Sequence, residues 1–123
     1  MKERKSLPES ELDIMLVVWK AEGPISAPKI MERLERKLTA SALHSYLKRL
    51  EEKGFLVCEK AGKTNSYRPL VVWEDYQSQE SQSILRKLYA GSLKRFAAAL
   101  YDGALTGADV DELQAYLDTL KEG

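Results

Sequence analysis

Hydrophobic residues recur at helical spacing near the start of the chain. Leu12, Met15 and Trp19 lie on one stripe, which is the period of an amphipathic helix. Other apolar side chains flank this stripe, so the helix has a wide inward face. A glycine and a proline follow directly and stop it. The pattern predicts a first helix from about Pro8 to about Glu22.

Two more amphipathic segments follow, joined by a brief turn. Ser26 is suited to accept hydrogen bonds from the first backbone N–H groups of a second helix, which we expect to run to about Arg36. Ile30 lies on its inward face. Thr39 or Ser41 can cap a third helix in the same way. Two short helices with so few residues between them have the spacing of a helix-turn-helix.

The third segment carries a leucine stripe and leads into a hairpin. Leu43, Leu47 and Leu50 are spaced at i, i+4 and i+7. Gly54 stands where a left-handed backbone favours glycine. Residues that favour strands then flank a turn at residues 62–65, and a proline ends the second run. A helix-turn-helix followed by a hairpin predicts a winged helix-turn-helix domain, mainly α with a small β-hairpin.

Helical spacing returns in the last third of the chain. Gly91, Gly103 and Gly107 divide it into three segments, and Thr106 with Asp109 forms a near capping box at the start of the last. Short helices cannot bury such apolar stripes alone, so we expect them to pair with a second chain. The residues assigned to dimerisation are Leu85, Leu88, Leu93, Phe96, Leu100, Val110, Leu113, Leu117 and Leu120.

Length and charge divide the chain in two. A chain of 123 residues can form one compact domain with an accessory segment. The formal net charge is zero, yet residues 1–71 carry 14 Lys/Arg and 10 Asp/Glu, a net of +4, whereas residues 72–123 carry 5 and 9, a net of −4. Only the first part can face a polyanion. We therefore expect a winged-helix DNA-binding domain over residues 1–71 and a helical dimerisation region over residues 72–123.

The single cysteine and the N-terminal residues bear on where the protein works. Cys58 has no partner for an intramolecular disulfide, which favours a reducing, cytoplasmic setting. It falls in an apolar strand pattern, where we expect a buried, inert thiol. The charged residues before Leu7 lack the apolar core of a signal peptide and are expected to fray. No later run is long enough to span a bilayer, so the sequence predicts a cytoplasmic protein with no membrane insertion.

The chain has few of the side chains that catalysis or metal binding needs. It has one histidine and one cysteine, and no nucleophile elbow, phosphate loop or paired histidine ligands. A transition-metal site needs several soft or imidazole donors. We predict that the protein is not an enzyme and that it uses no metal and no cofactor. Tyr46, Tyr67, Trp73 and Tyr76 are spaced as core residues rather than as a base-stacking platform.

Candidate DNA-contacting residues converge on the third helix and the hairpin. Short polar side chains near a helix N-terminus let the backbone approach the bases, and cations on a hairpin reach phosphate. For His44, a solvated surface histidine and a contact to a base edge or phosphate both stay open. Arg49 has a structural alternative, stacking or pairing with Glu52 or Glu9, and Lys53 adds to the basic cluster. The assigned residues are Ser41, Ala42, His44, Ser45, Lys48, Arg49, Lys60, Lys63 and Arg68.

Several blocks of the sequence, in this order and spacing, resemble the penicillinase-repressor family, which includes the β-lactamase, methicillin-resistance and copper-responsive repressors (BlaI/MecI/CopY). They are ELDIMLVVW at 11–19, SALHSYLKRLEEKGFL at 41–56, EKAGKTNSYRPL at 59–70, KLYAGSL at 87–93 and the terminal DVDELQAYLDTL. The resemblance implies a homodimeric repressor, with a winged helix on each half of a palindromic operator and a C-terminal helical dimerisation region. In the antibiotic-responsive members, a membrane sensor triggers proteolysis of that region and so releases DNA.

The sequence departs from the family pattern at informative places. Ala99-Leu100 aligns with the scissile Asn-Phe of those repressors, so the resemblance does not carry that cleavage over, and a membrane sensor protease or another inducing factor is the expected third partner. The C-terminus lacks the cysteine-rich metal tail of the copper-responsive members. Leu38 stands where the family often has tryptophan and Ala42 where it often has threonine, so the usual operator sequence is not implied.

Two other interpretations remain open. A winged-helix adaptor that binds protein and not DNA would favour an acidic or markedly apolar third helix, whereas residues 48–53 carry three basic and two acidic side chains. A ligand-responsive regulator would keep DNA binding and add a small-molecule pocket between the winged helix and the C-terminal helices. Trp73 and Tyr76 would line that pocket, but no convergent polar group supports it.

Overall fold

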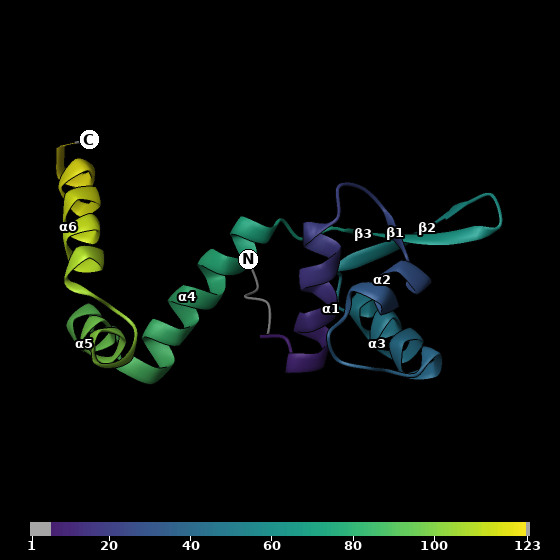
Figure 1. The fold of residues 1–123 in the computed structure, drawn as a ribbon, viewed down its shortest axis with the longest axis horizontal. Helices are drawn as coiled ribbons and strands as arrows, with labels where there is room; N and C mark the ends of the chain where they lie inside the picture. Colours follow the sequence, from purple (N-terminus) through teal and green to yellow (C-terminus); the bar gives the residue numbers. More distant parts are fainter. Residues whose placement is uncertain (1–5, 123) are drawn as a thin grey trace. The chain divides into compact units, whose positions relative to one another are not determined.

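The computed structural model describes residues 6–122 and divides into two compact units, the first ending at Glu80 and the second beginning at Ser81. It is mainly helical with one small sheet, as predicted (Figure 1). The fraying expected before Leu7 concerns residues that lie largely outside the described range. The elements in chain order are α1 (Glu9–Lys20), β1 (Ile25–Ser26), α2 (Ala27–Arg33), α3 (Ala40–Glu52), β2 (Leu56–Ala61), β3 (Thr64–Pro69), α4 (Trp73–Tyr89), α5 (Leu93–Gly103) and α6 (Gly107–Glu122).

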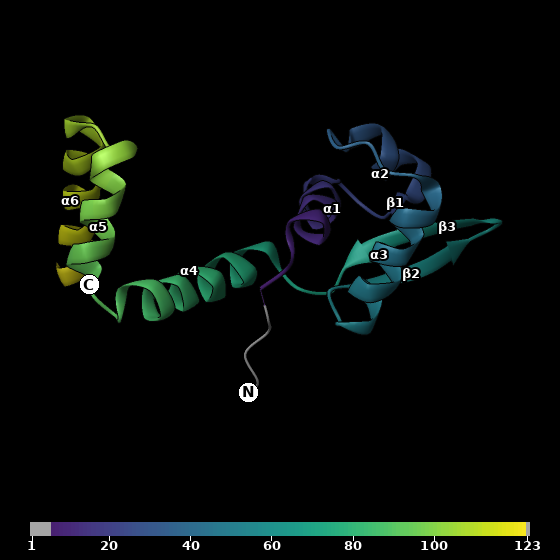
Figure 2. The same ribbon diagram turned by 90° about the horizontal axis from the view of Figure 1, so that it is seen from below.

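The sheet has three antiparallel strands in the order β1-β3-β2. β2 and β3 form the predicted hairpin, with Leu56 opposite Pro69 at its base, and its free end extends beyond the helices (Figures 1 and 2). β1 was not predicted. It pairs with β3 through Ile25 opposite Tyr67, and two residues are too few to give an alternating pattern in the sequence.

The core of the first unit lies between α1, α2, α3 and the sheet. Its most completely buried side chains, all at most 2% exposed, are Ile14, Met15, Val18, Ile30, Leu43, Leu47, Leu50, Phe55 and Leu56. The leucine stripe of α3 therefore faces inward as predicted. The buried face of α1 is turned slightly from the expected stripe, because Leu12 and Trp19 are only partly buried at its edge.

The predicted starts of α2 and α3 and the predicted end of α3 are confirmed, whereas α1 ends at Lys20, two residues before the predicted Glu22. The Ser26 hydroxyl accepts a hydrogen bond from the Lys29 N–H (3.4 Å) at the start of α2. The Thr39 hydroxyl accepts one from the Ala42 N–H (3.0 Å), so Thr39 caps α3. Gly54 has a φ of +81° just after α3, a backbone conformation in which a Cβ would be strained.

The second helix is shorter than predicted. It ends at Arg33 instead of about Arg36, because Leu34 is extended (φ −74°, ψ 131°). Residues 34–39 then form the connection to α3, longer than the brief turn expected. The Arg36 side chain reaches α1, where its Nη1 donates to the Ser10 hydroxyl (2.6 Å). This tertiary contact outweighs the helical spacing of the sequence.

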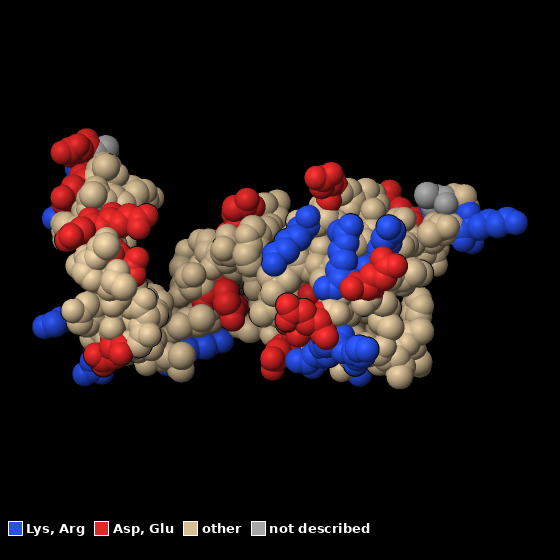
Figure 3. Space-filling model, in the orientation of Figure 1, with Lys and Arg blue, Asp and Glu red and all other residues tan. Residues whose placement is uncertain are grey.

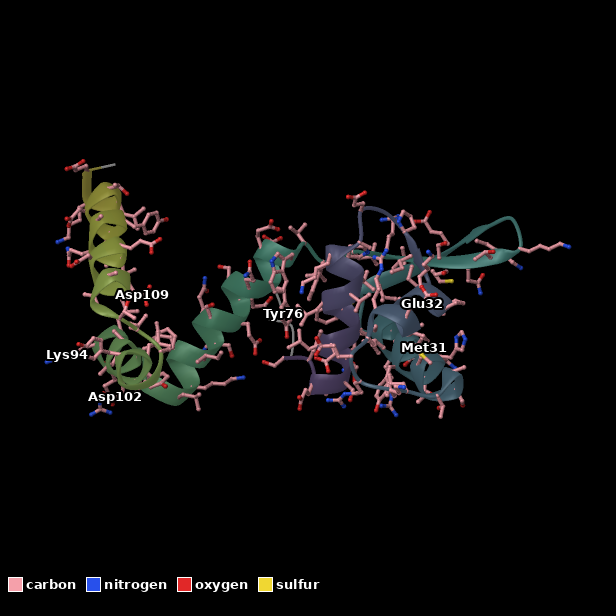
Figure 4. All side chains as sticks on the ribbon, viewed as in Figure 1. Met31, Glu32, Tyr76, Lys94, Asp102 and Asp109 are labelled. Carbon is pink, nitrogen blue, oxygen red and sulfur yellow. The ribbon has the colours of Figure 1, made fainter. Side chains whose placement is uncertain are left out.

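The first turns of α4 pack against α1. Trp73 and Tyr76 lie with their ring centroids 5.0 and 5.3 Å from that of Trp19, and Tyr76 also meets the Phe55 ring edge-on at 5.8 Å. Tyr76 is labelled in Figure 4. The Leu7 N–H donates to the Tyr76 hydroxyl (3.1 Å). These aromatic residues fill the core, as their spacing predicted.

This packing extends the first compact unit as far as Glu80. The division predicted after Val71, into a DNA-binding domain and a dimerisation region, concerns function and stays a prediction. Within the described residues, no helix is both long and apolar enough to cross a membrane.

The second unit contains the end of α4 and the helices α5 and α6. Thr106 and Asp109 form the predicted capping box: the Thr106 N–H donates to the Asp109 carboxylate (2.9 Å) and the Asp109 N–H donates to the Thr106 hydroxyl (3.2 Å). Tyr89 and Phe96 bring their rings to 5.2 Å. Both α5 and α6 lie wholly within the described residues, and neither has a buried side chain.

Candidate nucleic-acid interface

One face of α3 is free of the core. The helix has its three leucines in the core, so the residues between them point away from it. Ser41, His44, Ser45 and Lys48 are exposed there, as the assignment to DNA contact requires. Ala42 is only partly exposed, which makes it the least accessible of the assigned residues. α2 packs beside α3 and carries Met31 and Glu32 (Figure 4).

Arg49 shows the stacking that was its structural alternative. Its guanidinium carbon lies 5.6 Å from the centroid of the Tyr46 ring, a distance at which a cation is attracted to the ring face. Of the two carboxylates named as alternative partners, Glu52 and Glu9, the Glu9 carboxylate lies 3.5 Å from Arg36. Arg49 remains exposed, so its contact with DNA stays a prediction.

The hairpin carries the remaining assigned cations. Gly62 has a φ of +67° at the turn, which allows β2 and β3 to reverse within two residues. Lys60 and Lys63 are exposed near this turn, and Lys and Arg atoms gather at the free end of the hairpin (Figure 3). Arg68 lies further back and pairs with Glu59 on β2. A phosphate would have to compete with that carboxylate for Arg68.

Lys53 pairs with a buried carboxylate, and this pair was not predicted. Its Nζ lies 2.6 Å from the Glu11 carboxylate, whose side chain is only 3% exposed. The signal was present in the sequence, because Glu11 precedes Ile14, Met15 and Val18 by three, four and seven positions and so shares their inward face. A carboxylate at such a position needs a cation. Lys53 therefore neutralises a buried carboxylate at the edge of the core.

Tyr67 links the hairpin to the core. It lies on β3 opposite Cys58 and is buried, whereas Cys58 is only half-buried and not fully buried as expected. Burial, and then the neighbouring Cys58 sulfur and the Glu51 carboxylate, raise the pKa of the Tyr67 hydroxyl to about 12. The hydroxyl is therefore neutral at any physiological pH.

Two open hollows lie on the first unit, away from the assigned residues. One has a volume of about 330 Å³ and lies between α1 and the end of α2; the other, about 380 Å³, lies beside β1 and the start of α2. Trp73 and Tyr76, on which the small-molecule alternative depended, line neither of these two and pack against Trp19 instead. In the part of the chain described, His, Cys, Asp and Glu form no cluster of three or more that could hold a metal ion.

The apolar residues assigned to dimerisation lie largely in the open. Seven of them are between 40% (Leu100) and 72% (Leu88) exposed, while Leu85 and Phe96 are partly buried. Tyr101 and Tyr116 are exposed on the same two helices and were not assigned. Tyr101 stands eight residues after Leu93, and Tyr116 three residues after Leu113; these helical spacings could have indicated both.

A family model and a sequence relative both match this chain over nearly its whole length. The family model described as penicillinase repressor matches residues 7–119. The penicillinase repressor of Bacillus licheniformis is 30% identical over 124 residues, which cover 98% of this chain and 96% of that protein. An uncharacterised 16.5 kDa protein of Latilactobacillus sakei is 29% identical and covers 88% of this chain and 75% of its own length.

Solved structures show weaker similarity. An ArsR-like transcriptional regulator from Rhodococcus sp. RHA1 is 20% identical with a TM-score of 0.46, covering 80% of this chain and 86% of its own. ZitR of Lactococcus lactis in complex with DNA is 14% identical with a TM-score of 0.42, covering 99% of this chain and 80% of its own. TM-scores below 0.5 are too low to bear on function.

Proposed function

Because this chain belongs to the penicillinase repressor family, we propose that it represses transcription as a homodimer bound to a palindromic operator. Proteins of this family are DNA-binding transcription regulators and not enzymes. Beyond this family role, we propose that the chain forms a homodimer, that its operator is palindromic and that the residues assigned above contact the DNA. Such a protein would act in the cytoplasm.

The observation that carries the proposal is the exposed apolar surface of the second unit. No residue of α5 or α6 is fully buried within the chain, although both helices carry several leucines. Leucines at this exposure cost free energy until another surface covers them, about 25 cal/mol for each Å². A second copy of the same unit supplies a surface of matching chemistry.

Support for DNA as the partner comes from the first unit. α3 offers short polar side chains and Lys48 from one exposed face, and the hairpin offers Lys60 and Lys63. In a winged helix, such a helix enters the major groove and the hairpin meets the backbone. A two-fold symmetric dimer would then read half-sites spaced about 10 bp, or a multiple of that, apart.

The route of release stays open within this proposal. Ala99 and Leu100, which align with the scissile pair of the antibiotic-responsive repressors, lie inside α5. A protease needs an extended segment of chain, so cleavage there would require α5 to unfold locally. A membrane sensor protease or another inducing factor would then act on the locally unfolded form of α5.

A selection of bound sequences from a random DNA pool tests the proposal. We expect the purified full chain to enrich a palindrome, with affinity that falls steeply as salt rises. Enrichment of an asymmetric single site would overturn the dimeric proposal. Failure to enrich any sequence would overturn operator binding itself.

A further inference from the structure

The connection that leads into α3 is tied to the first turns of α1. Arg36 donates to the Ser10 hydroxyl (2.6 Å) and lies 3.5 Å from the carboxylates of both Glu9 and Asp13. Arg36 stands four residues before the first residue of α3. This side chain thus attaches the entry of α3 to α1.

The other end of α3 is tied to the same part of α1. Lys53 follows the last residue of α3, and its backbone N–H still donates to the Arg49 carbonyl (2.9 Å). Its ammonium group lies 2.6 Å from the Glu11 carboxylate. Since Glu11 is almost fully buried, losing Lys53 would leave an uncompensated charge. This pair is therefore a firm attachment, unlike an exposed ion pair.

The residues just before α1 are attached to α4. The Leu7 N–H donates to the Tyr76 hydroxyl (3.1 Å), and the Ser6 hydroxyl lies 2.8 Å from the Glu80 carboxylate. Burial raises the pKa of Tyr76, with the Glu80 carboxylate in the same direction and the Leu7 N–H against it, so the Tyr76 hydroxyl keeps its proton. Beyond Glu80, the same helix continues into the second unit.

One segment, residues 6–13, therefore holds both ends of α3 and is itself held by α4. We propose that residues 6–13 position α3 for DNA binding, through Arg36 before its first residue and Lys53 after its last, and tie that position to α4. Glu11 and Asp13 are positioning residues in this arrangement, since they act through the cations they bind. The inference rests on the proposed function, because it concerns the affinity for operator DNA.

Removing a carboxylate distinguishes an effect of positioning on operator affinity from an effect of charge. Glu11→Gln and Asp13→Asn each take away one negative charge, which by electrostatics alone strengthens binding to a polyanion. Positioning predicts the opposite: we expect operator affinity to fall roughly three- to tenfold, as for other residues that modulate binding without touching the ligand. The slope of affinity against salt should stay unchanged, because no phosphate contact is lost.

Glu52→Gln is the matched control. Glu52 is an exposed carboxylate at the end of α3, and its removal should leave operator binding unchanged or slightly tighter. All variants are compared in the full chain, at a temperature where their circular dichroism shows the folded state. If Glu11→Gln does not fold, Asp13→Asn decides the outcome, since its side chain is 36% exposed and its loss leaves the core intact.

A double-mutant cycle tests whether Glu11 acts on DNA binding through Lys53. If Glu11 acts through Lys53, Glu11→Gln should change the affinity of Lys53→Met far less than that of the wild type. Affinities of Glu11→Gln and Asp13→Asn that match Glu52→Gln, while the wild type binds its operator, would overturn the inference and leave the proposed function standing. A wild type that enriches no DNA sequence overturns both.

Discussion

The two units of this chain bury their apolar side chains very differently. In the first, three helices and a sheet enclose a core whose central residues, such as Ile14 and Leu50, are fully buried. In the second, α5 and α6 leave leucines such as Leu93 and Leu120 more than half exposed. The first unit has a core of its own. The second unit has the apolar side chains that a core needs, but its own helices do not cover them. This difference is the basis of the proposed dimer.

The largest expected effect concerns the first unit alone. Ile14→Ala should lower the free energy of unfolding by about 4 kcal/mol, because it opens a cavity in a closed core. Leu93→Ala, at 67% exposure, should cost well under 1 kcal/mol in the dilute single chain. Urea denaturation monitored by circular dichroism measures both. Equal losses would mean that the second unit has a closed core of its own.

The next effect concerns the proposed dimer. Leu113→Asp places a charge on the exposed apolar face of α6 and should weaken association by about 3 kcal/mol, or more than a hundredfold. Ala115→Asp introduces the same residue near the opposite face of the helix and should leave association unchanged. Sedimentation of the two variants over a range of concentrations distinguishes them. A Leu113→Asp protein that associates like the wild type would place the interface elsewhere.

The first unit is expected to supply the contacts with DNA. Replacing Lys48 and Lys63 together by alanine should weaken operator binding roughly a hundredfold and reduce the salt slope by about 2. Lys94→Ala, on α5, should change neither quantity. Fluorescence titration of labelled operator at several salt concentrations measures both. If Lys94→Ala has the larger effect, the roles of the two units are wrongly assigned.

The smallest effect is a pH dependence confined to the first unit. The pKa of Tyr67 is about 12 in the folded chain and about 10 when unfolded. Its contribution to stability is therefore fully present below pH 10 and is lost as the pH rises toward 12, by up to about 2 kcal/mol. Tyr67→Phe should show a shallower fall in stability over this range than Tyr116→Phe. The same fall in both variants would assign the effect to other groups.

Local signals explain what could be predicted of this fold. Thr39, Gly54 and the leucine stripe define α3 within a few residues of chain, and Thr106 with Asp109 does the same for α6. The two strands of the hairpin lie next to each other in sequence, so they too could be predicted.

Contacts between distant residues explain what was missed. β1 exists only because Ile25 meets Tyr67 on β3. α2 ends early, and Arg36 just beyond it donates a hydrogen bond to Ser10, 26 positions away. Lys53 looked like a DNA contact, and its partner Glu11 lies 42 positions away. Such pairs depend on the packing of the whole unit, which no local pattern specifies.

The mass of the complex formed on one operator tests the central claim most directly. Sedimentation equilibrium of the full chain with a short duplex carrying the selected site measures that mass, with the protein at concentrations above the binding midpoint. The exposed faces of α5 and α6 predict two chains on each duplex, and two chains without DNA at higher protein concentration. One chain on each duplex, or a protein that stays monomeric at all concentrations, would contradict it.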